Sequence, residues 1–259
     1  MDLATILGIV SGFGLIFFGI GMGNIGNFIS LSSVAITIGG TIAALVASTP
    51  GEVLKGVGKH LRIAIGANKY DPKQYIETLV DLAQSARKHG LLSLESRAME
   101  LDEPFLKDSV LLIVDAYDSD KVKQMLEQEL KFLDERHARC FKLYERGAGF
   151  CPAFGMIGTL IGLINMLKDL NIDSGGGSAI GEGMSLALVT TFYGSICANL
   201  FFSPISNKLK ARHADEMMCK QIIVEGVLSI QSGENPKFIR EKLISYLSDK
   251  EKSIMREEN

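Results

Sequence analysis

The stretch CPAFGMIGTLIGLIN, residues 151–165, is an uncharged apolar run that contains two residues of unusual chemistry for such a place, Pro152 and Thr159. A proline removes one backbone hydrogen-bond donor and bends a helix unless neighbouring groups compensate. A threonine places a hydroxyl, which both donates and accepts hydrogen bonds, among side chains that do neither. A second proline, Pro204, lies in FFSPIS at the end of another uncharged run. The pair predicts either a bend in each run or two prolines that only shape helix ends.

Charges of both signs gather in the stretch SARKHGLLSLE. A helix is predicted over 71–89, because Asp-Pro is a favourable helix start and Gly90 favours a stop. Arg87 and Lys88 then lie at a helix C-terminus, where cations gain about 0.3–1 kcal/mol each from the dipole. Glu95 falls in the first turn of the next predicted helix, the matching place for an anion. These charges are either a binding surface or simple helix caps.

The elements that must position these residues are four long runs without Asp, Glu, Lys, Arg or His. Each run is about as long as a helix needs to cross a bilayer. They cover residues 3–20, 28–48, 148–167 and 183–203. The sequence therefore predicts four transmembrane helices.

Basic residues predict the orientation of these helices, because Lys and Arg near membrane segments stay on the cytoplasmic side. Every Lys and Arg except Lys168 lies between residues 55 and 146 or between 208 and 256. The links at 21–27 and 169–180 are then outside, and the second link carries Asp169 and Asp173. The acidic start MDLATI is not typical of a cleaved signal peptide. We expect both termini and the large loop to be cytoplasmic.

The polar parts contain helical patterns and no strand-like alternation of useful length. The expected fold class is an all-helical membrane protein with a helical cytoplasmic domain between the second and third spans and a helical C-terminal tail. An amphipathic helix at 52–65 lies either at the membrane surface or against the rest of the cytoplasmic part. The further helices are expected from about Leu94, from Asp118 into the third span, from about Asn207, and over 237–247.

Several motifs do not point to an enzyme. Gly21, Gly23 and Gly26 match G-x-G-x-x-G but do not follow a strand. The stretch SGGGS lacks the Gly-Lys-Ser/Thr of a phosphate loop. His137 and Cys140 share a helix face, yet two ligands do not make a zinc site. No nucleophile, base and orienter set is present, and we expect no catalytic residue, metal, cofactor or nucleic-acid partner.

Small residues at four-residue spacing, such as Gly158 with Gly162, favour close helix contacts in lipid. Cysteines are expected to remain free, because they fall in cytoplasmic and membrane segments. The absence of ionisable residues in all four runs has a further consequence. Conduction across a membrane normally needs an ionisable group within it, so an ion path through this chain would need a carboxylate from another protein.

Taken together, four stretches resemble the A subunit of the bacterial flagellar motor stator, the MotA and PomA family. They are CPAFGMIGTLIGL, TTFYGSICANLFFSPIS, SARKHGLLSLE and NPKFIREKL. The similarity extends over essentially the whole chain, in the order and topology of that family. It implies domains at 1–48 (first two spans), 49–147 (cytoplasmic rotor-contacting part), 148–204 (last two spans) and 205–259 (cytoplasmic tail).

The resemblance implies an inner-membrane complex that converts ion flow into torque on the rotor protein FliG. A ring of five A subunits would surround a dimer of the B subunit, whose membrane helix carries the ion-binding Asp. By position, the resemblance assigns rotor contacts, ion-path hydroxyls and coupling prolines to this chain. The rotor contacts are Arg87, Lys88 and Glu95. The ion-path hydroxyls belong to Thr159 and Thr191, and the coupling prolines are Pro152 and Pro204.

Two questions stay open at this point. The transported ion is H+ or Na+, because Thr159 and Thr191 fit the sodium-type pattern whereas Ser30 stands where the sodium-type relative has an aspartate. The alternative functions are an energiser of envelope transport like ExbB and TolQ, or a passive membrane scaffold. Neither alternative is excluded by composition, since both classes would be helical membrane proteins.

Overall fold

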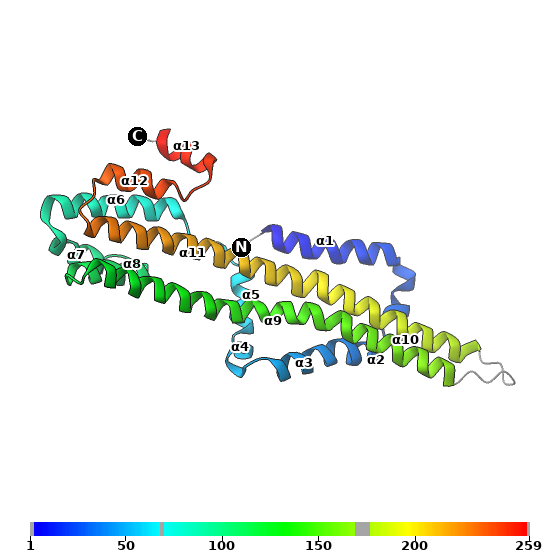
Figure 1. Cartoon of the computed structure of the whole chain (residues 1–259). Helices are drawn as coiled ribbons and strands as arrows, with labels where there is room; N and C mark the ends of the chain where they lie inside the picture. The colour runs from blue at the N-terminus through cyan, green and yellow to red at the C-terminus, as the bar shows by residue number, and fades with distance from the viewer. Residues whose placement is uncertain (1–2, 68–69, 169–176, 258–259) are drawn as a thin grey trace. The chain divides into compact units, whose positions relative to one another are not determined.

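The computed structural model describes residues 3–67, 70–168 and 177–257, and every regular element in these ranges is helical (Figure 1). The described residues thus confirm the all-helical class. Two compact units are formed. The first contains Met1–Ala67 and Ala138–Ala211, and the second contains Asn68–His137 and Arg212–Asn259. The link residues Asp169 and Asp173, and most of SGGGS, lie outside the described residues.

The first unit begins with α1 (Leu3–Ile20), which has the bounds predicted from the uncharged run. The predicted link after it is a 3-10 helix, η1 (Met22–Phe28), bent by 99° from α1. The second apolar segment follows as α2 (Leu31–Val34), the π-helical turn η2 (Ala35–Gly39) and α3 (Gly40–Ser48). It starts three residues later than expected, because Ser30 caps α2 by accepting a hydrogen bond from the backbone of Ser33.

Two very long helices cross from one unit to the other. The predicted entry of a cytoplasmic helix into the third apolar run is confirmed by α9 (Ser119–Lys168), which has 50 residues and contains Pro152. The predicted helix start near Asn207 is wrong. Instead α10 (Gly177–Ile196), the π-helical η5 (Cys197–Phe202) and α11 (Ser203–Gln231) follow one another without a break. The wider π turn accommodates Pro204 where an α-helix would clash with it.

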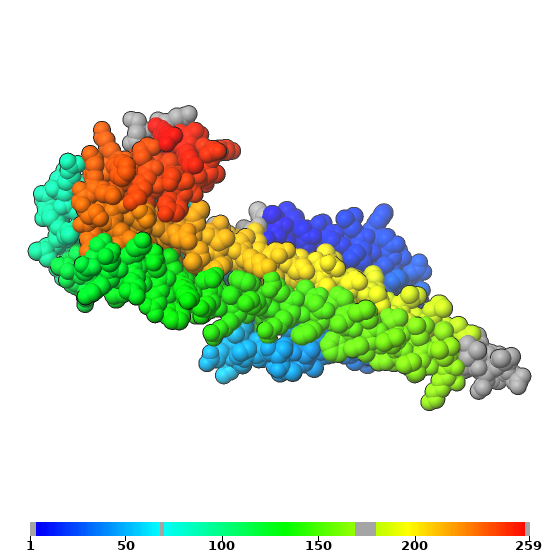
Figure 2. Space-filling view, viewed as in Figure 1, coloured from blue at the N-terminus to red at the C-terminus, as the bar shows by residue number. Residues whose placement is uncertain are grey.

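By length and composition, three helical segments of the described chain are long and apolar enough to cross a membrane. A fourth joins them if the bent pair of α1 and η1 is one span. Figure 2 shows α1, in dark blue, beside the yellow surface of the later helices of the same unit. The contact is close, since a Cβ on Gly12 of α1 would meet Leu200 of η5 at 2.8 Å.

The amphipathic segment at 52–65 is two helices, α4 (Gly51–Lys55) and α5 (Val57–Ile65), rather than one. Its apolar side packs inside the first unit, where Ala64 is buried with Leu143 and Tyr144 of α9. The packed alternative therefore describes this segment. Lys55, Lys59 and Arg62 stay on the exposed side, as their spacing predicts.

The second unit has its own core, built from α6, α7, α8, α12 and parts of α9 and α11. Local signals predicted α6 (Pro72–His89), in which Asp71 accepts from the Lys73 backbone and Gly90 adopts φ 84°. They also predicted α7 (Leu94–Met99) and α12 (Pro236–Ile244). Two helices were not predicted, α8 (Pro104–Val114) and the C-terminal α13 (Asp249–Glu257).

Candidate functional site

The hydroxyls of Thr159 on α9 and Thr191 on α10 lie side by side in the first unit. Their Oγ1 atoms are 2.6 Å apart, and each is 3.1 Å from the carbonyl oxygen of Ala187. Thr159 also lies 3.1 Å from the carbonyl of Gly155, one turn earlier in its own helix. Thr159 is half-buried and Thr191 is exposed in the isolated chain. The structure therefore brings together two residues that are 32 positions apart.

The two hydroxyl groups have lone pairs that their internal hydrogen bonds do not use, so they can accept a bond from a ligand. Each hydroxyl has one hydrogen and two lone pairs. In one arrangement Thr191 donates to the Ala187 carbonyl and Thr159 donates to Thr191, so the lone pairs of Thr159 remain available. In the reverse arrangement Thr159 donates to the Ala187 carbonyl and Thr191 donates to Thr159, so the lone pairs of Thr191 remain available. Hydroxyl and carbonyl oxygens are ligands for hard cations and for water. The pair can therefore accept a hydrated proton or a small cation, but it supplies no negative charge.

Further hydroxyls on the second apolar segment were not singled out from the sequence. Thr37 and Thr41 are essentially buried, and the Thr37 hydroxyl donates to the carbonyl of Thr190 on α10 at 3.3 Å. Thr41 donates to the carbonyl of Thr37 at 2.6 Å. Thr190 is itself buried and bonds carbonyls of its own helix. Two threonines four residues apart in an otherwise apolar run were the signal that could have revealed this polar stripe.

Glycines allow α9 and α10 to approach closely next to the hydroxyl pair. A Cβ on Gly158 would overlap the side chain of Thr190, and one on Gly162 would lie 2.5 Å from the carbonyl oxygen of Gly183. Real Cβ atoms do not approach backbone oxygens so closely. The close helix contact that their four-residue spacing predicts is confirmed for this pair.

The two prolines lie on either side of the hydroxyl pair in the sequence, Pro152 before Thr159 in α9 and Pro204, in α11, after Thr191. Pro152 is exposed inside the continuous α9, and a Cβ on Gly194 of α10 would meet the backbone of Cys151 at 2.6 Å. Pro204 is the second residue of α11 and directly follows η5. Both prolines therefore interrupt backbone hydrogen bonding in α9 and in the α10–α11 helix. One lies in an α-helical setting and the other beside a π turn.

The charged stretch of the second unit lies at the junction of α6, the 3-10 helix η3 (Leu91–Ser93) and α7. Arg87, Lys88 and Glu95 are exposed there, and none has an ion-pair partner within 4.0 Å among the described residues. Neighbouring charges are used internally instead, since Arg97 of α7 pairs with Asp81 of α6. The predicted contact residues are thus free to bind an external partner of mixed charge.

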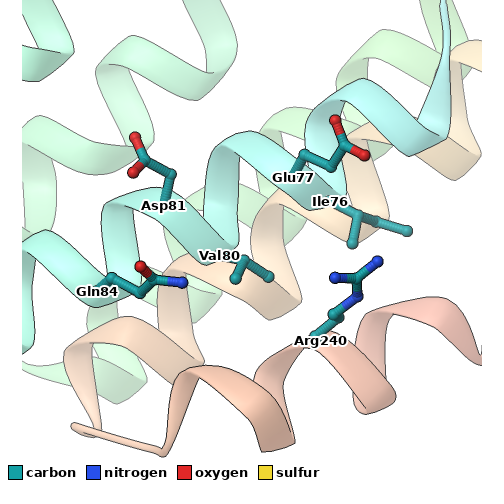
Figure 3. A pocket seen from close by; sticks show the side chains of 6 residues that line it. All are labelled: Ile76, Glu77, Val80, Asp81, Gln84 and Arg240. Carbon is teal, nitrogen blue, oxygen red and sulfur yellow. The ribbon is translucent and has the colours of Figure 1, made fainter. Parts of the chain in front are cut away.

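A groove between α6 and α12 is a concave feature of the second unit (Figure 3). It is lined by Ile76, Glu77, Val80, Asp81, Gln84 and Arg240. Arg240 donates to the carbonyl of Met255 at 2.8 Å, and so tethers α13. Asp81 is engaged by Arg97. Asp81 and Arg240 of this groove therefore have structural partners.

No group of three or more metal-ligating side chains is assembled within the described ranges. The sequence places the four histidines apart, but the structure brings His137 of α9 to His213 of α11, with their Nδ1 atoms 3.1 Å apart. By sequence, His137 shares a helix face with Cys140 as a possible zinc ligand. In the structure the ring next to His137 is that of His213, which comes from α11.

Comparison with known proteins places this architecture among ion-conducting membrane complexes. Residues 97–222 match the model of the MotA/TolQ/ExbB proton channel family. The chain is 41% identical to Motility protein A of Borreliella burgdorferi, over 98% of this chain and 96% of that protein. It is 36% identical to the chemotaxis protein PomA of Vibrio alginolyticus, over 98% of each.

Solved structures agree over the same length. The chain superposes on a chain of the C. jejuni MotAB structure with a TM-score of 0.87 and 31% identity, covering 96% of this chain and 97% of that one. It superposes on a chain of the flagellar MotAB stator complex from Bacillus subtilis with a TM-score of 0.86 and 27% identity, covering 98% of both. Both helical units are thus included in the likeness.

Proposed function

This chain belongs to the MotA/TolQ/ExbB proton channel family, and we propose that it is the A subunit of an ion-driven flagellar motor stator. It forms an ion-conducting complex with a B subunit and converts ion flow into torque on the rotor. The full-length similarity to Motility protein A and PomA favours this function over an ExbB or TolQ energiser. Membership of a channel family is also consistent with a role that involves no catalysis.

The Thr159–Thr191 hydroxyl pair is the observation that carries the proposal. It offers oxygen ligands between two apolar helices that have no ionisable side chain in their central segments. An ion path normally includes an ionisable group inside the membrane. A carboxylate from a B subunit beside these two hydroxyls completes such a path. The match to MotAB complexes supports a partner of this kind.

The proposed topology has four spans in the bacterial inner membrane, with both termini and the large loop in the cytoplasm. Residues 1–48 form the first two spans, 49–147 the rotor-contacting part, 148–204 the last two spans, and 205–259 the cytoplasmic tail. The distribution of Lys and Arg supports this orientation. An assembly of five A subunits around a B dimer is part of the same proposal, as is contact of its spans with membrane lipid.

Arg87, Lys88 and Glu95 are proposed to contact the rotor protein FliG. Their exposure supports this role, as does the lack of ion-pair partners for them among the described residues. The energies are also suitable, because one ion crossing 100 mV releases about 2.3 kcal/mol. An exposed ion pair contributes about 0.2–1 kcal/mol. A single ion can therefore break and remake one such contact.

Pro152 and Pro204 are proposed to couple the ion path to the cytoplasmic helices. Pro152 lies in α9 together with Thr159, and Pro204 lies in α11, which continues from α10 and its Thr191 through η5. The transported ion is H+ or Na+. Ser30, where the sodium-type relative has an aspartate, is engaged as the cap of α2 and accepts bonds from Ser33. A hydroxyl at this position provides no charge to attract a cation to the outer end of the path.

Deletion and complementation test the function directly. We expect deletion to abolish swimming while flagella are still assembled, and re-expression together with the adjacent B subunit to restore it. Unimpaired swimming combined with defective uptake across the envelope would instead support the ExbB type. Vesicles containing both subunits should conduct H+ or Na+ under an imposed gradient, whereas a passive scaffold should conduct neither.

A further inference from the structure

Two histidine rings join α9 to α11 in the second unit. The Nδ1 atoms of His137 and His213 are 3.1 Å apart, and the ring centroids are 5.2 Å apart with an edge-on angle of 78°. The other nitrogen of His213, Nε2, lies 2.8 Å from a carboxylate oxygen of Asp134. A carboxylate oxygen of Glu216 lies 3.6 Å from Nδ1 of His137. Each ring thus has one carboxylate beside it.

These contacts determine where the protons lie. The carboxylate of Asp134 accepts from Nε2 of His213, so a neutral His213 has a bare Nδ1. His137 must then carry its hydrogen on Nδ1 and donate to His213. One further proton fits on Nε2 of His137, which leaves the ring–ring bond in place. A second added proton would have to occupy Nδ1 of His213, and two N–H groups would then face each other.

Charged groups around the pair come from three segments. Glu216 and Lys220 lie on α11, Arg136 on α9, and Glu103 immediately before α8 approaches Lys220 at 3.0 Å. Tyr70, before α6, hydrogen-bonds Glu216. Both rings are shielded from water, since their side chains are only 31% and 13% exposed.

Burial is the main influence that lowers the pKa of His137. Glu216 opposes this effect, whereas His213, Arg136 and Lys220 add to it. These influences act in the same direction as the geometry, which disfavours the second added proton.

We propose that His137 and His213 form a proton-operated joint, which holds α9 against α11 and opens when the pair takes up its second added proton. In the open state the rings repel each other, and each pairs with its own carboxylate, His213 with Asp134 and His137 with Glu216. No other reactant is needed, because the step is proton binding alone. Opening loosens the contact between the two helices. This inference does not depend on the proposed function.

The titration of the histidine rings is the first test. In the purified full-length chain with isotope-labelled histidine, NMR should resolve His137 and His213 titrating in two steps more than about one pH unit apart, since strongly interacting groups share macroscopic steps. One common midpoint for His137 and His213 would overturn the proposal.

The second test measures the joint itself by hydrogen–deuterium exchange of residues 119–137 and 212–231, corrected for the intrinsic effect of pH. When the pH is lowered from 7.5 to about 5, we expect exchange in these segments of the wild type to accelerate about tenfold. A tenfold change in the opening equilibrium corresponds to a pKa difference of about one unit between the closed and open states. The variant His137→Asn should keep slow exchange at both pH values, because an amide can donate to or accept from His213 by rotating.

Matched controls make the second test decisive. His89→Asn alters an exposed histidine at the end of α6 and should keep the acceleration of the wild type. Far-ultraviolet circular dichroism would verify that both variants remain helical. The proposal is overturned if exchange in the wild type is independent of pH, or if His137→Asn accelerates as much as the wild type does.

Discussion

The hydroxyl oxygens of Thr159 and Thr191 lie 2.6 Å apart, and both are within hydrogen-bond distance of the carbonyl oxygen of Ala187. Two adjacent helices thereby present three oxygen atoms at one point of an otherwise apolar surface. No carboxylate of this chain lies within these uncharged segments, so under the proposed function the three oxygens would form one half of an ion site. In a stator, the B subunit would supply the other half.

The first prediction concerns this hydroxyl pair. Thr159→Val or Thr191→Val removes one hydroxyl and keeps the shape, so ion flux through vesicles containing the A and B subunits should fall strongly. The double variant should lose no more than either single variant, because the two oxygens act together. Thr78→Val, which removes a hydroxyl bonded only within α6, is the matched control. Additive losses in the double variant would contradict a shared site.

The second prediction concerns the close contact of α9 and α10. Gly158→Ala should destabilise the first unit by about 1–3 kcal/mol, the usual cost of overpacking, because the added methyl overlaps Thr190. Gly8→Ala is the control, since a Cβ there has nothing within 4 Å. Thermal unfolding in detergent measures both. Equal melting temperatures for the two variants would mean that the helices separate readily.

The third prediction separates torque from assembly. Reversal of charge at Arg87 and Glu95 together should abolish swimming, whereas the protein should still assemble with the B subunit in the membrane. Both side chains are exposed, so lost dipole interactions should cost only about 0.3–1 kcal/mol each. Lys250→Glu, at an exposed position of α13, should swim normally. Normal motility of the double reversal would remove these residues from the rotor contact.

The fourth prediction concerns Pro152. Pro152→Ala restores a backbone donor inside α9, and a proline in a helix interior costs about 3 kcal/mol relative to alanine. The variant should therefore be more stable to heat but generate less torque, if a bend at this residue couples the ion path to the cytoplasmic helices. Bead rotation and thermal unfolding measure the two effects. Unchanged torque would reduce Pro152 to a residue that shapes the helix.

The fifth prediction concerns pH. Burial lowers the pKa of His60 on α5, and the charge of Lys59 lowers it further. The buried Nδ1 atom of His60 has no hydrogen-bond partner among the described residues. The unfolded chain therefore binds a proton more readily than the folded one, and the stabilising effect of the neutral ring is lost as pH falls below about 6.5. His60→Phe keeps an aromatic ring beside Tyr144. This variant should lose less thermal stability than the wild type between pH 7.5 and 5.5. An equal loss in both proteins would show that His60 is not the cause of the pH dependence.

Much of the architecture could be predicted from local sequence. Uncharged runs, the Asp71 cap and the Gly90 stop indicated helices that the structure contains, because hydropathy and capping depend on a few neighbouring residues. The charged residues Arg87 and Glu95 were placed correctly at helix ends for the same reason. The helix start near Asn207 was placed wrongly, since the change from apolar to charged residues there does not interrupt the helix, and α11 begins at Ser203 directly after η5.

The sequence by itself thus determined the helical class, most helix ends and the absence of any charge in the four apolar runs. Only the tertiary structure decided which side chains meet. Thr37 with Thr190, Thr159 with Thr191, and His137 with His213 depend on the rotation and close approach of separate helices. That rotation follows from packing over the whole helix surface, glycine contacts included, and no short window of sequence contains it.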